Sequence, residues 1–191
     1  MKYYMFSYNY MNSDDTVLLE IDGETLKFNR YDVEKRKIES DEWTSEIKVV
    51  FDKSKGSRVS DYLSNNLGWI IVTEKLKNII ESMGNEGVQF LPIRAVSQDG
   101  MDIIDAYVVN IYNYVDAALD LERSIYTMLE VDEQRKLMIV VKPVLNSNAI
   151  KGIDIFKIPE SFPMTFISER LKNAIELSGA TQCKYYEVKV V

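Results

Sequence analysis

The first sixty residues alternate short apolar runs with polar turns, a pattern typical of β-strands. Asp22-Gly23 is a hairpin signal between the second and third runs. The sequence therefore predicts four short strands, at Lys2–Tyr8, Val17–Ile21, Leu26–Phe28 and Glu46–Phe51.

The middle of the chain shows helical periodicity. Leu76, Ile79, Ile80 and Met83 form one apolar stripe, and Gly84 follows as a C-terminal stop. Thr73 occupies the N-cap position, where a hydroxyl satisfies a free backbone N–H. We expect strands on either side of this helix, at Trp69–Val72, Val88–Val96 and Ile103–Val115.

The C-terminus repeats this unit. The string IIVTEKLKNIIESMG aligns with TFISERLKNAIELSG, and Ser168 replaces Thr73 as the cap. We predict an α+β fold with two similar strand-helix-strand lobes, residues 69–96 and 164–191, on mostly antiparallel sheets. An N-terminal set of short strands, residues 1–60, precedes the region 61–191, and together they form one compact unit. Lys53–Asp61 is the best linker candidate, because it is polar and interrupted by a glycine.

Two further segments separate the copies of the repeat. Ser124–Glu130 and Leu137–Leu145 predict a hairpin around VDEQRK. DAALDLE predicts a helical turn whose Ala118, Leu119 and Leu121 pack inward.

The residue content excludes several kinds of chemistry. The 191 residues include one cysteine and no histidine. Ser-His-Asp and Cys-His nucleophiles, imidazole bases, imidazole-ligated metals, zinc thiolate clusters and an intrachain disulfide are therefore all excluded. The eight glycines form no phosphate-binding motif. We expect no cofactor, no metal and no enzymatic activity.

Four positions have both a chemical and a structural interpretation. Asp116 and Asp120 would share a helix face and hold magnesium or transfer protons, but no catalytic partner lies nearby in the sequence. Cys183 aligns with Val88 of the first copy, which favours a small core residue over a reactive thiol. Ser168 precedes an amphipathic run, which favours a cap over a nucleophile.

The charge is concentrated in one segment. The net charge is −7, and Ser97–Gln134 holds nine acidic residues and one basic residue, Arg123. Acidic residues mixed with tyrosines suit a basic protein partner, because charge steers the encounter and rings supply contact area. A solvated sheet face remains the alternative. The candidate contacts are Asp99, Asp102, Asp105, Tyr112, Tyr114, Glu130, Asp132 and Glu133.

Trp43 lies in the acidic string ESDEWTSE. It is either an exposed binding anchor or, as its large ring favours, a cover for the core.

Three further expectations concern location and partners. An acidic chain repels phosphate backbones, which disfavours nucleic acid as a partner. No apolar run is long enough to span a bilayer. The opening MKYYMFSYNYMNSDD lacks the features of a secretory signal, so we expect a cytoplasmic protein without a membrane partner.

Five blocks together resemble an immunity-protein family of bacterial polymorphic toxin systems, immunity family eleven, formerly a domain of unknown function. In order they are NNLGWIIVTEKLKNII, QFLPI, DAALDLERS, KGIDIFKI and FISERLKNAIE. The resemblance covers Asp61 to the C-terminus, and Thr73 departs from the usual serine. The matched positions resemble fold determinants rather than toxin contacts: Gly68, Trp69, Asp116, Asp120, Gly152, Asp154, Phe156 and Ser168.

The resemblance implies an inhibitor that neutralises a cognate toxin by stoichiometric binding and has no catalytic residues. A non-catalytic interaction module, or a sensor of a small ligand, is the alternative. Co-purification with a neighbouring gene product would favour immunity, and a bound metabolite would favour the sensor.

Overall fold

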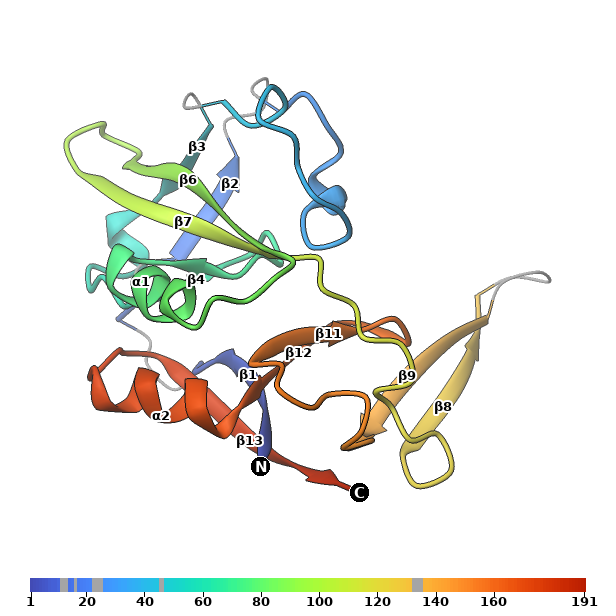
Figure 1. Ribbon diagram of the computed structural model, residues 1–191. Coiled ribbons are helices and arrows are strands. Elements are labelled where there is room, and N and C mark those ends of the chain that lie inside the picture. The colour runs from blue at the N-terminus through green and yellow to red at the C-terminus, as the bar shows by residue number, and fades with distance from the viewer. Residues whose placement is uncertain (11–13, 16, 22–25, 45–46, 132–135) are drawn as a thin grey trace. The chain divides into compact units, whose positions relative to one another are not determined.

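The computed structural model describes residues 1–10, 14–15, 17–21, 26–44, 47–131 and 136–191 (Figure 1). The chain divides into two compact units, each assembled from segments that are distant in sequence. Unit 1 comprises Met1–Ser7, Asn113–Asn173 and Tyr185–Val191, and unit 2 comprises Tyr8–Tyr112 and Ala174–Lys184. The division near residue 60 that the sequence suggests stays a prediction.

Unit 2 is built on β2 (Val17–Ile21), η1 (Arg30–Asp32), β3 (Lys48–Phe51), η2 (Lys53–Lys55), β4 (Tyr62–Asn65), β5 (Ile71–Val72), α1 (Glu74–Ser82), β6 (Val88–Ser97) and β7 (Ile103–Ile111). The strands form a closed barrel in the order β2-β3-β6-β7-β5-β4. The β2–β4 and β3–β6 pairs are parallel, and the other pairs are antiparallel. α1 packs against β5 and β7.

The barrel core follows the two-residue period of its strands. On β6, Leu91, Ile93 and Ala95 are buried, whereas Pro92 and Arg94 are exposed. Side chains of this kind from β3, β4, β5, β6 and β7 join one hydrophobic cluster. Alternation therefore turns one face of each strand inward, as the sequence predicts for Val88–Val96.

Residues 26–44 form no strand, so the strand predicted at Leu26–Phe28 is wrong. Leu26 and Phe28 pack instead against the barrel core, where the Phe28 ring stacks on Trp43 at a centroid distance of 5.8 Å. β2 pairs with β3 rather than with this segment. Trp43 is buried and its Nε1 donates to the Pro92 carbonyl at 2.8 Å, which confirms the core interpretation. The predicted Asp22-Gly23 turn lies outside the described residues.

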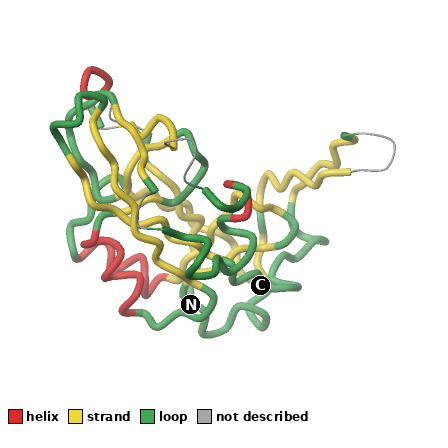
Figure 2. The backbone as a smooth tube through the Cα atoms, turned by 90° about the horizontal axis from the view of Figure 1, so that it is seen from above, coloured by secondary structure: helices red, strands yellow, loops and turns green. Residues whose placement is uncertain are grey.

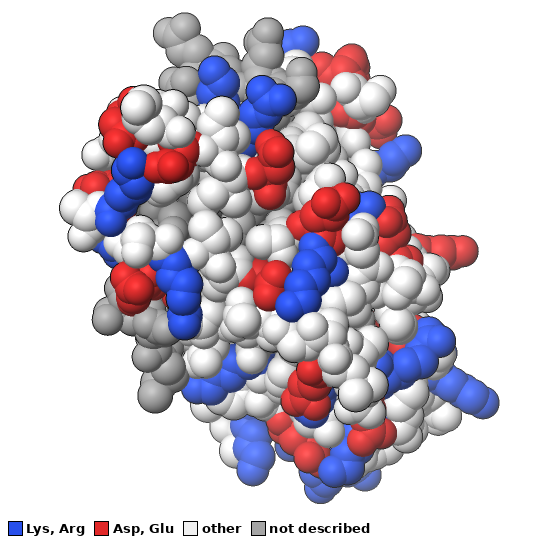
Figure 3. Space-filling view, turned by 90° about the vertical axis from the view of Figure 1, so that its left-hand side faces the viewer, with Lys and Arg blue, Asp and Glu red and all other residues white. Residues whose placement is uncertain are grey.

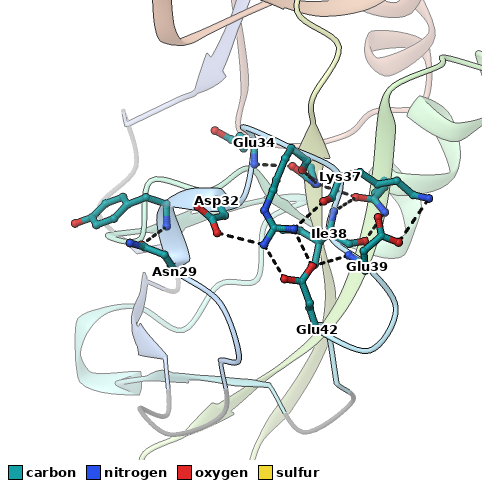
Figure 4. A network of polar contacts seen from close by, with 11 residues as sticks. Asn29, Asp32, Glu34, Lys37, Ile38, Glu39 and Glu42 are labelled. Carbon is teal, nitrogen blue, oxygen red and sulfur yellow. Dashed lines mark hydrogen bonds and ion pairs between the residues drawn. The ribbon is translucent and has the colours of Figure 1, made fainter.

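Two barrel side chains hold this irregular segment in place (Figure 4). Asn110 of β7 accepts the Glu34 backbone N–H at 2.5 Å and donates to the Arg36 carbonyl at 2.9 Å. Gln89 of β6 makes a reciprocal pair of 2.9 Å bonds with the backbone of Ile38. Backbone N–H and C=O groups near the core need hydrogen-bond partners. The side-chain amides of Asn110 and Gln89 therefore replace the backbone hydrogen bonds that a neighbouring strand would make.

Ion pairs of Arg36 link three residues of the same segment to one another (Figure 4). Arg36 makes two 2.7 Å bonds to the Glu42 carboxylate and a 3.2 Å bond to Asp32. The Arg36 bonds, with the Glu39 backbone N–H, lower the pKa of Glu42 to about 2.

Unit 1 holds all or most of β1 (Tyr3–Tyr8), β8 (Ile125–Glu130), β9 (Lys136–Lys142), β10 (Val144–Leu145), β11 (Ile155–Ile158), β12 (Ser161–Ser168), α2 (Glu169–Leu177) and β13 (Cys183–Val190). The last residue of β1, the second half of α2 and the first two residues of β13 belong to unit 2. One sheet has the order β10-β13-β1-β12-β11, and β8 and β9 form a second sheet of two strands. The Phe156 ring stacks on Phe166 at 5.4 Å and meets Tyr3 edge-on at 5.8 Å, which forms the aromatic centre of this core.

The repeat seen in the sequence corresponds to β5-α1-β6 and β12-α2-β13. In each copy another strand lies between the two repeat strands: β7 between β5 and β6, and β1 between β12 and β13. The two copies belong to different sheets. The α+β class is confirmed, since the described residues form mainly sheet and two short α-helices.

The caps of the two helices differ. Ser168 Oγ accepts the Leu171 N–H at 3.2 Å, as a cap should. Thr73 occupies the N-cap position of α1, but its hydroxyl makes no cap bond and donates to Asp61 at 2.9 Å. The capping prediction is thus confirmed for Ser168 and wrong for the Thr73 side chain, whose hydroxyl is oriented toward Asp61 and not toward the N–H groups of the first helical turn.

The helical turn predicted at DAALDLE is wrong. Ala117 has φ +56°, and Leu119 forms a β-bridge with Leu145, which draws the chain toward the sheet. Ala118 and Leu119 are buried as expected, but Leu121 is 43% exposed.

Two other segments have clear outcomes. The linker candidate Lys53–Asp61 lies wholly inside unit 2, where Arg58 Nε donates to the buried carboxylate of Asp15 at 2.8 Å. The predicted hairpin is confirmed as β8 and β9, paired from Ile125↔Lys142 to Glu130↔Lys136.

Candidate protein-binding surface

The turn between β6 and β7 holds two of the acidic candidates in a defined conformation. Asp99 accepts bonds from the Ser97 hydroxyl at 2.5 Å and the Met101 N–H at 3.1 Å. The Asp102 N–H donates to Ser97 Oγ at 2.9 Å. Hydrogen bonds from Ser97 and Lys53 lower the pKa of Asp99 below its ordinary value. Asp99 is therefore a structural element of the turn as well as a surface charge.

Basic residues offset part of this negative charge. Lys53 Nζ lies 2.9 Å from Asp99 and 2.6 Å from Asp102, and both bonds raise its pKa to about 12, with the Asp102 bond contributing more. Asp105 is the most exposed of the three acids, at 84% of its side chain, and lies 3.7 Å from Arg94. The net negative field of the turn is thus weaker than the sequence alone indicates.

Exposed apolar side chains lie beside these acids. Met101 is 80% exposed, Ile103 60% and Val59 49%. With Lys53 and Asp102 they line a surface pocket of about 350 Å³. We define the turn patch as Val59, Asp99, Met101, Asp102, Ile103 and Asp105. Charge beside protruding apolar contacts is the composition that protein interfaces use.

The other candidates are not part of the turn patch. Tyr112 belongs to unit 2 and is half-buried, with its N–H bonded to the Gly87 carbonyl at 2.9 Å. Tyr114 and Glu130 belong to unit 1. Asp132 and Glu133 lie outside the described residues. Figure 3 shows acidic and basic side chains interspersed over the face that it draws, rather than one continuous acidic area.

The Gly68-Trp69 motif lies in a tight, hydrogen-bonded turn of unit 2. Gly68 has φ +79°, a left-handed conformation that favours glycine. Asn65 Oδ1 accepts the Leu67 and Trp69 N–H groups at 3.1 and 3.3 Å, which closes the turn. The buried Trp69 donates from Nε1 to the Arg30 carbonyl at 3.1 Å.

Asp154 is the centre of a buried polar cluster. Its side chain is 4% exposed and accepts bonds from Ser168 Oγ at 2.5 Å and from Arg170 through both Nε and Nη2. Burial alone would raise the pKa of Asp154, but the hydrogen bonds from Arg170 and Ser168 outweigh it and lower the pKa below its ordinary value. The cluster joins the start of α2 to the segment before β11.

The remaining motif positions also have contacts within unit 1. Gly152 has φ +81° in a loop whose Ile150 and Ile153 carbonyls accept bonds from Tyr3 Oη at 2.6 and 3.0 Å. Phe156 is fully buried. Asp120 accepts the Arg123 N–H at 3.0 Å and pairs with its guanidinium at 2.6 Å.

Asp116 and Asp120 do not share a helix face, because the chain forms turns and not a helix here. In the part of the chain that the structure describes, no group of three or more His, Cys, Asp or Glu side chains is arranged to hold a metal ion. No helix among the described residues is long and apolar enough to cross a membrane. Cys183 is half-buried at the start of β13.

The immunity protein family model (Imm11) matches residues 2–190. The chain belongs to this family. The Imm11 match includes the N-terminal third, which lies outside the resemblance from Asp61 to the C-terminus. No curated protein matches the chain significantly. For this Imm11 protein, membership implies a role in toxin immunity.

One surface was not anticipated from the sequence. All six residues of β8 are exposed, and apolar side chains cover much of the β8–β9 hairpin. Strands this rich in apolar residues are typical of a buried core, so their exposure is visible only once the neighbours of the hairpin are known.

Proposed function

We propose that this Imm11 protein neutralises a cognate toxin by stoichiometric binding in the cytoplasm and catalyses no reaction itself. The observation that carries the proposal is the family match over residues 2–190. We further propose that the turn patch contacts the toxin and that the toxin surface is basic. The exposed acids would steer the encounter, and Met101 and Ile103 would supply contact area.

The first test is growth rescue. Co-expression with the toxin encoded by the neighbouring gene should restore growth, and the two proteins should co-purify in a 1:1 complex. Equal cell death with and without this protein, or turnover of a substrate by the purified chain, would contradict the proposal.

The second test concerns the turn patch. The variant Asp102→Lys/Asp105→Lys reverses two exposed charges and leaves Asp99, which holds the turn, in place. Because steering acts on the encounter, association with the toxin should slow by about tenfold or more, and its salt dependence should weaken.

The matched control is Glu39→Lys/Asp41→Lys, which makes the same charge change at exposed positions of the same unit. Stopped-flow association at two ionic strengths compares the variants. If both pairs slow association equally, only net charge matters. If neither does, the turn patch is not the contact surface.

A further inference from the structure

The β8–β9 hairpin of unit 1, whose two strands lie side by side in Figures 1 and 2, carries many exposed apolar side chains. On the inner face of β9, Val140 is buried against the unit 1 core. The large apolar residues of the hairpin that are at least 39% exposed are Ile125, Tyr126, Met128, Leu129, Val131, Leu137, Ile139 and Val141. Gatherings of exposed apolar side chains mark protein–protein interaction sites, whereas single exposed apolar residues do not.

The outer edge of β8 is also unprotected. Among the described residues no third strand pairs with the hairpin, so β8 presents backbone donors and acceptors along its outer edge. Monomeric proteins guard such edges with lysine, proline or bulges. Ile125–Leu129 contains neither lysine nor proline, and the register shift between Ile125 and Tyr126 leaves the extra residue, Val141, on β9. β9, by contrast, begins and ends with lysine, and Pro143 follows it.

We propose that the β8 edge pairs with β8 of a second copy of this chain. The two strands would run antiparallel with Thr127 opposite Thr127, which gives a four-stranded sheet with the order β9-β8-β8-β9. A two-fold axis perpendicular to the sheet generates this arrangement and makes the contact self-complementary. The proposal does not depend on toxin binding.

The side chains of β8 fit this register. Ile125 would lie opposite Leu129, Tyr126 opposite Met128, and Thr127 opposite itself, and pairs of these kinds stabilise antiparallel sheets. Centring β9 on its own copy at Ile139 would instead place Lys136 opposite Lys142, and like charges directly opposite are destabilising. The sequence therefore favours self-pairing through β8.

The charges of β8 are compatible with a second copy as the occupant. In the proposed register Glu130 would lie opposite Ser124, so no two like charges face each other. Within its own hairpin Glu130 lies opposite Lys136, and Arg123 is paired with Asp120 at 2.6 Å. Neither end of β8 therefore opposes the approach of a second copy by charge repulsion.

Cross-linking tests the register directly. In a Cys183→Ser background, Thr127→Cys places two thiols on opposed residues about 4.5–5.5 Å apart between Cα atoms, which a disulfide can bridge. The matched control is Ile139→Cys, the ladder partner of Thr127 on β9. Its copies would lie three strand spacings apart, about 14 Å, which is too far. With oxidised glutathione, Thr127→Cys should form covalent dimers and Ile139→Cys should not.

Light scattering after size exclusion tests the assembly itself. The unmodified protein should elute at twice the chain mass at micromolar concentration. Thr127→Lys places two ammonium groups at the two-fold axis and should raise the dimer dissociation constant at least tenfold. Ile139→Lys adds the same charge away from the axis and should leave the dimer intact, with circular dichroism confirming that both variants fold.

A monomeric wild-type protein at 100 μM would overturn the proposal, as would equal cross-linking of the two cysteine variants. A monomer whose toxin binding is lost in Thr127→Lys would assign the edge to the toxin instead, and would also overturn it.

Discussion

Ser168 and Thr73 occupy equivalent positions of the repeat but make different bonds, so the same substitution should have unequal effects. Ser168 Oγ caps α2 through the Leu171 N–H at 3.2 Å and donates to the buried Asp154 carboxylate at 2.5 Å. Ser168→Ala removes both bonds. Thr73→Ala removes only a bond to Asp61, which keeps the Thr181 N–H as a donor at 2.9 Å.

The expected costs follow from these contacts. Loss of an N-cap hydroxyl costs about 1 kcal/mol. Loss of a hydrogen bond to a buried charged group costs roughly 1.5–3 kcal/mol, so Ser168→Ala should lower the free energy of unfolding by about 3 kcal/mol. Thr73 makes no cap bond, and Thr73→Ala should cost about 1 kcal/mol, the usual value for one partly exposed hydrogen bond.

Urea unfolding followed by far-UV circular dichroism measures the difference, since strands of both units contribute to that signal. Adding Asp154→Asn to Ser168→Ala completes a double-mutant cycle, and residues in direct contact should give a coupling of roughly 1 kcal/mol or more. Equal costs for the two alanine variants, or a coupling near zero, would refute the reasoning that the Asp154 bond distinguishes the two copies.

Two other predictions concern stability. Arg170 lowers the folded-state pKa of Asp154, so the ionised Asp154 stabilises the fold above the unfolded pKa of about 4. This stabilisation is lost as the pH falls through the folded-state pKa. The free energy of unfolding should therefore decline less between pH 5 and pH 2 in Asp154→Asn than in the wild type, and an identical decline would contradict this. A Cβ on Gly56 would overlap the Asp15 carbonyl, whereas one on Gly152 meets no atom within 4 Å. Gly56→Ala should therefore cost more than about 3 kcal/mol and Gly152→Ala about 1–2 kcal/mol, and thermal melts showing similar losses would argue against the close approach.

Local patterns correctly predicted the elements whose apolar residues recur with the period of a helix or of a strand. The Leu76 stripe gave α1, the alternation along Val88–Ser97 gave β6, and the similarity around Ser168 revealed the second strand-helix-strand copy. Where the apolar pattern is too short to define a period, the predictions failed. Leu26 and Phe28 pack against the barrel core, but the backbone of this segment joins no ladder.

The acidic segment shows the same limit for the candidate surface. The sequence correctly located the acids and the turn that carries Asp99 and Asp102. It did not reveal that Lys53, from a distant segment, pairs with both. Nor did it reveal the exposed apolar neighbours Met101 and Val59, because the position of a side chain relative to solvent depends on what else packs beside it.

The sequence by itself determined the α+β class, the repeated helix unit, the hairpin of β8 and β9, and the resemblance that the family match over residues 2–190 confirms. These features depend on residues close together in the chain. Only the tertiary structure decided that β2 closes a barrel by pairing with both β3 and β4, that β1 lies between β12 and β13, and that the β8 edge is exposed. Each of these features depends on contacts between segments that are distant in sequence. Such contacts form only when the whole chain folds, because only then do the strands find their pairing partners and the apolar side chains become buried.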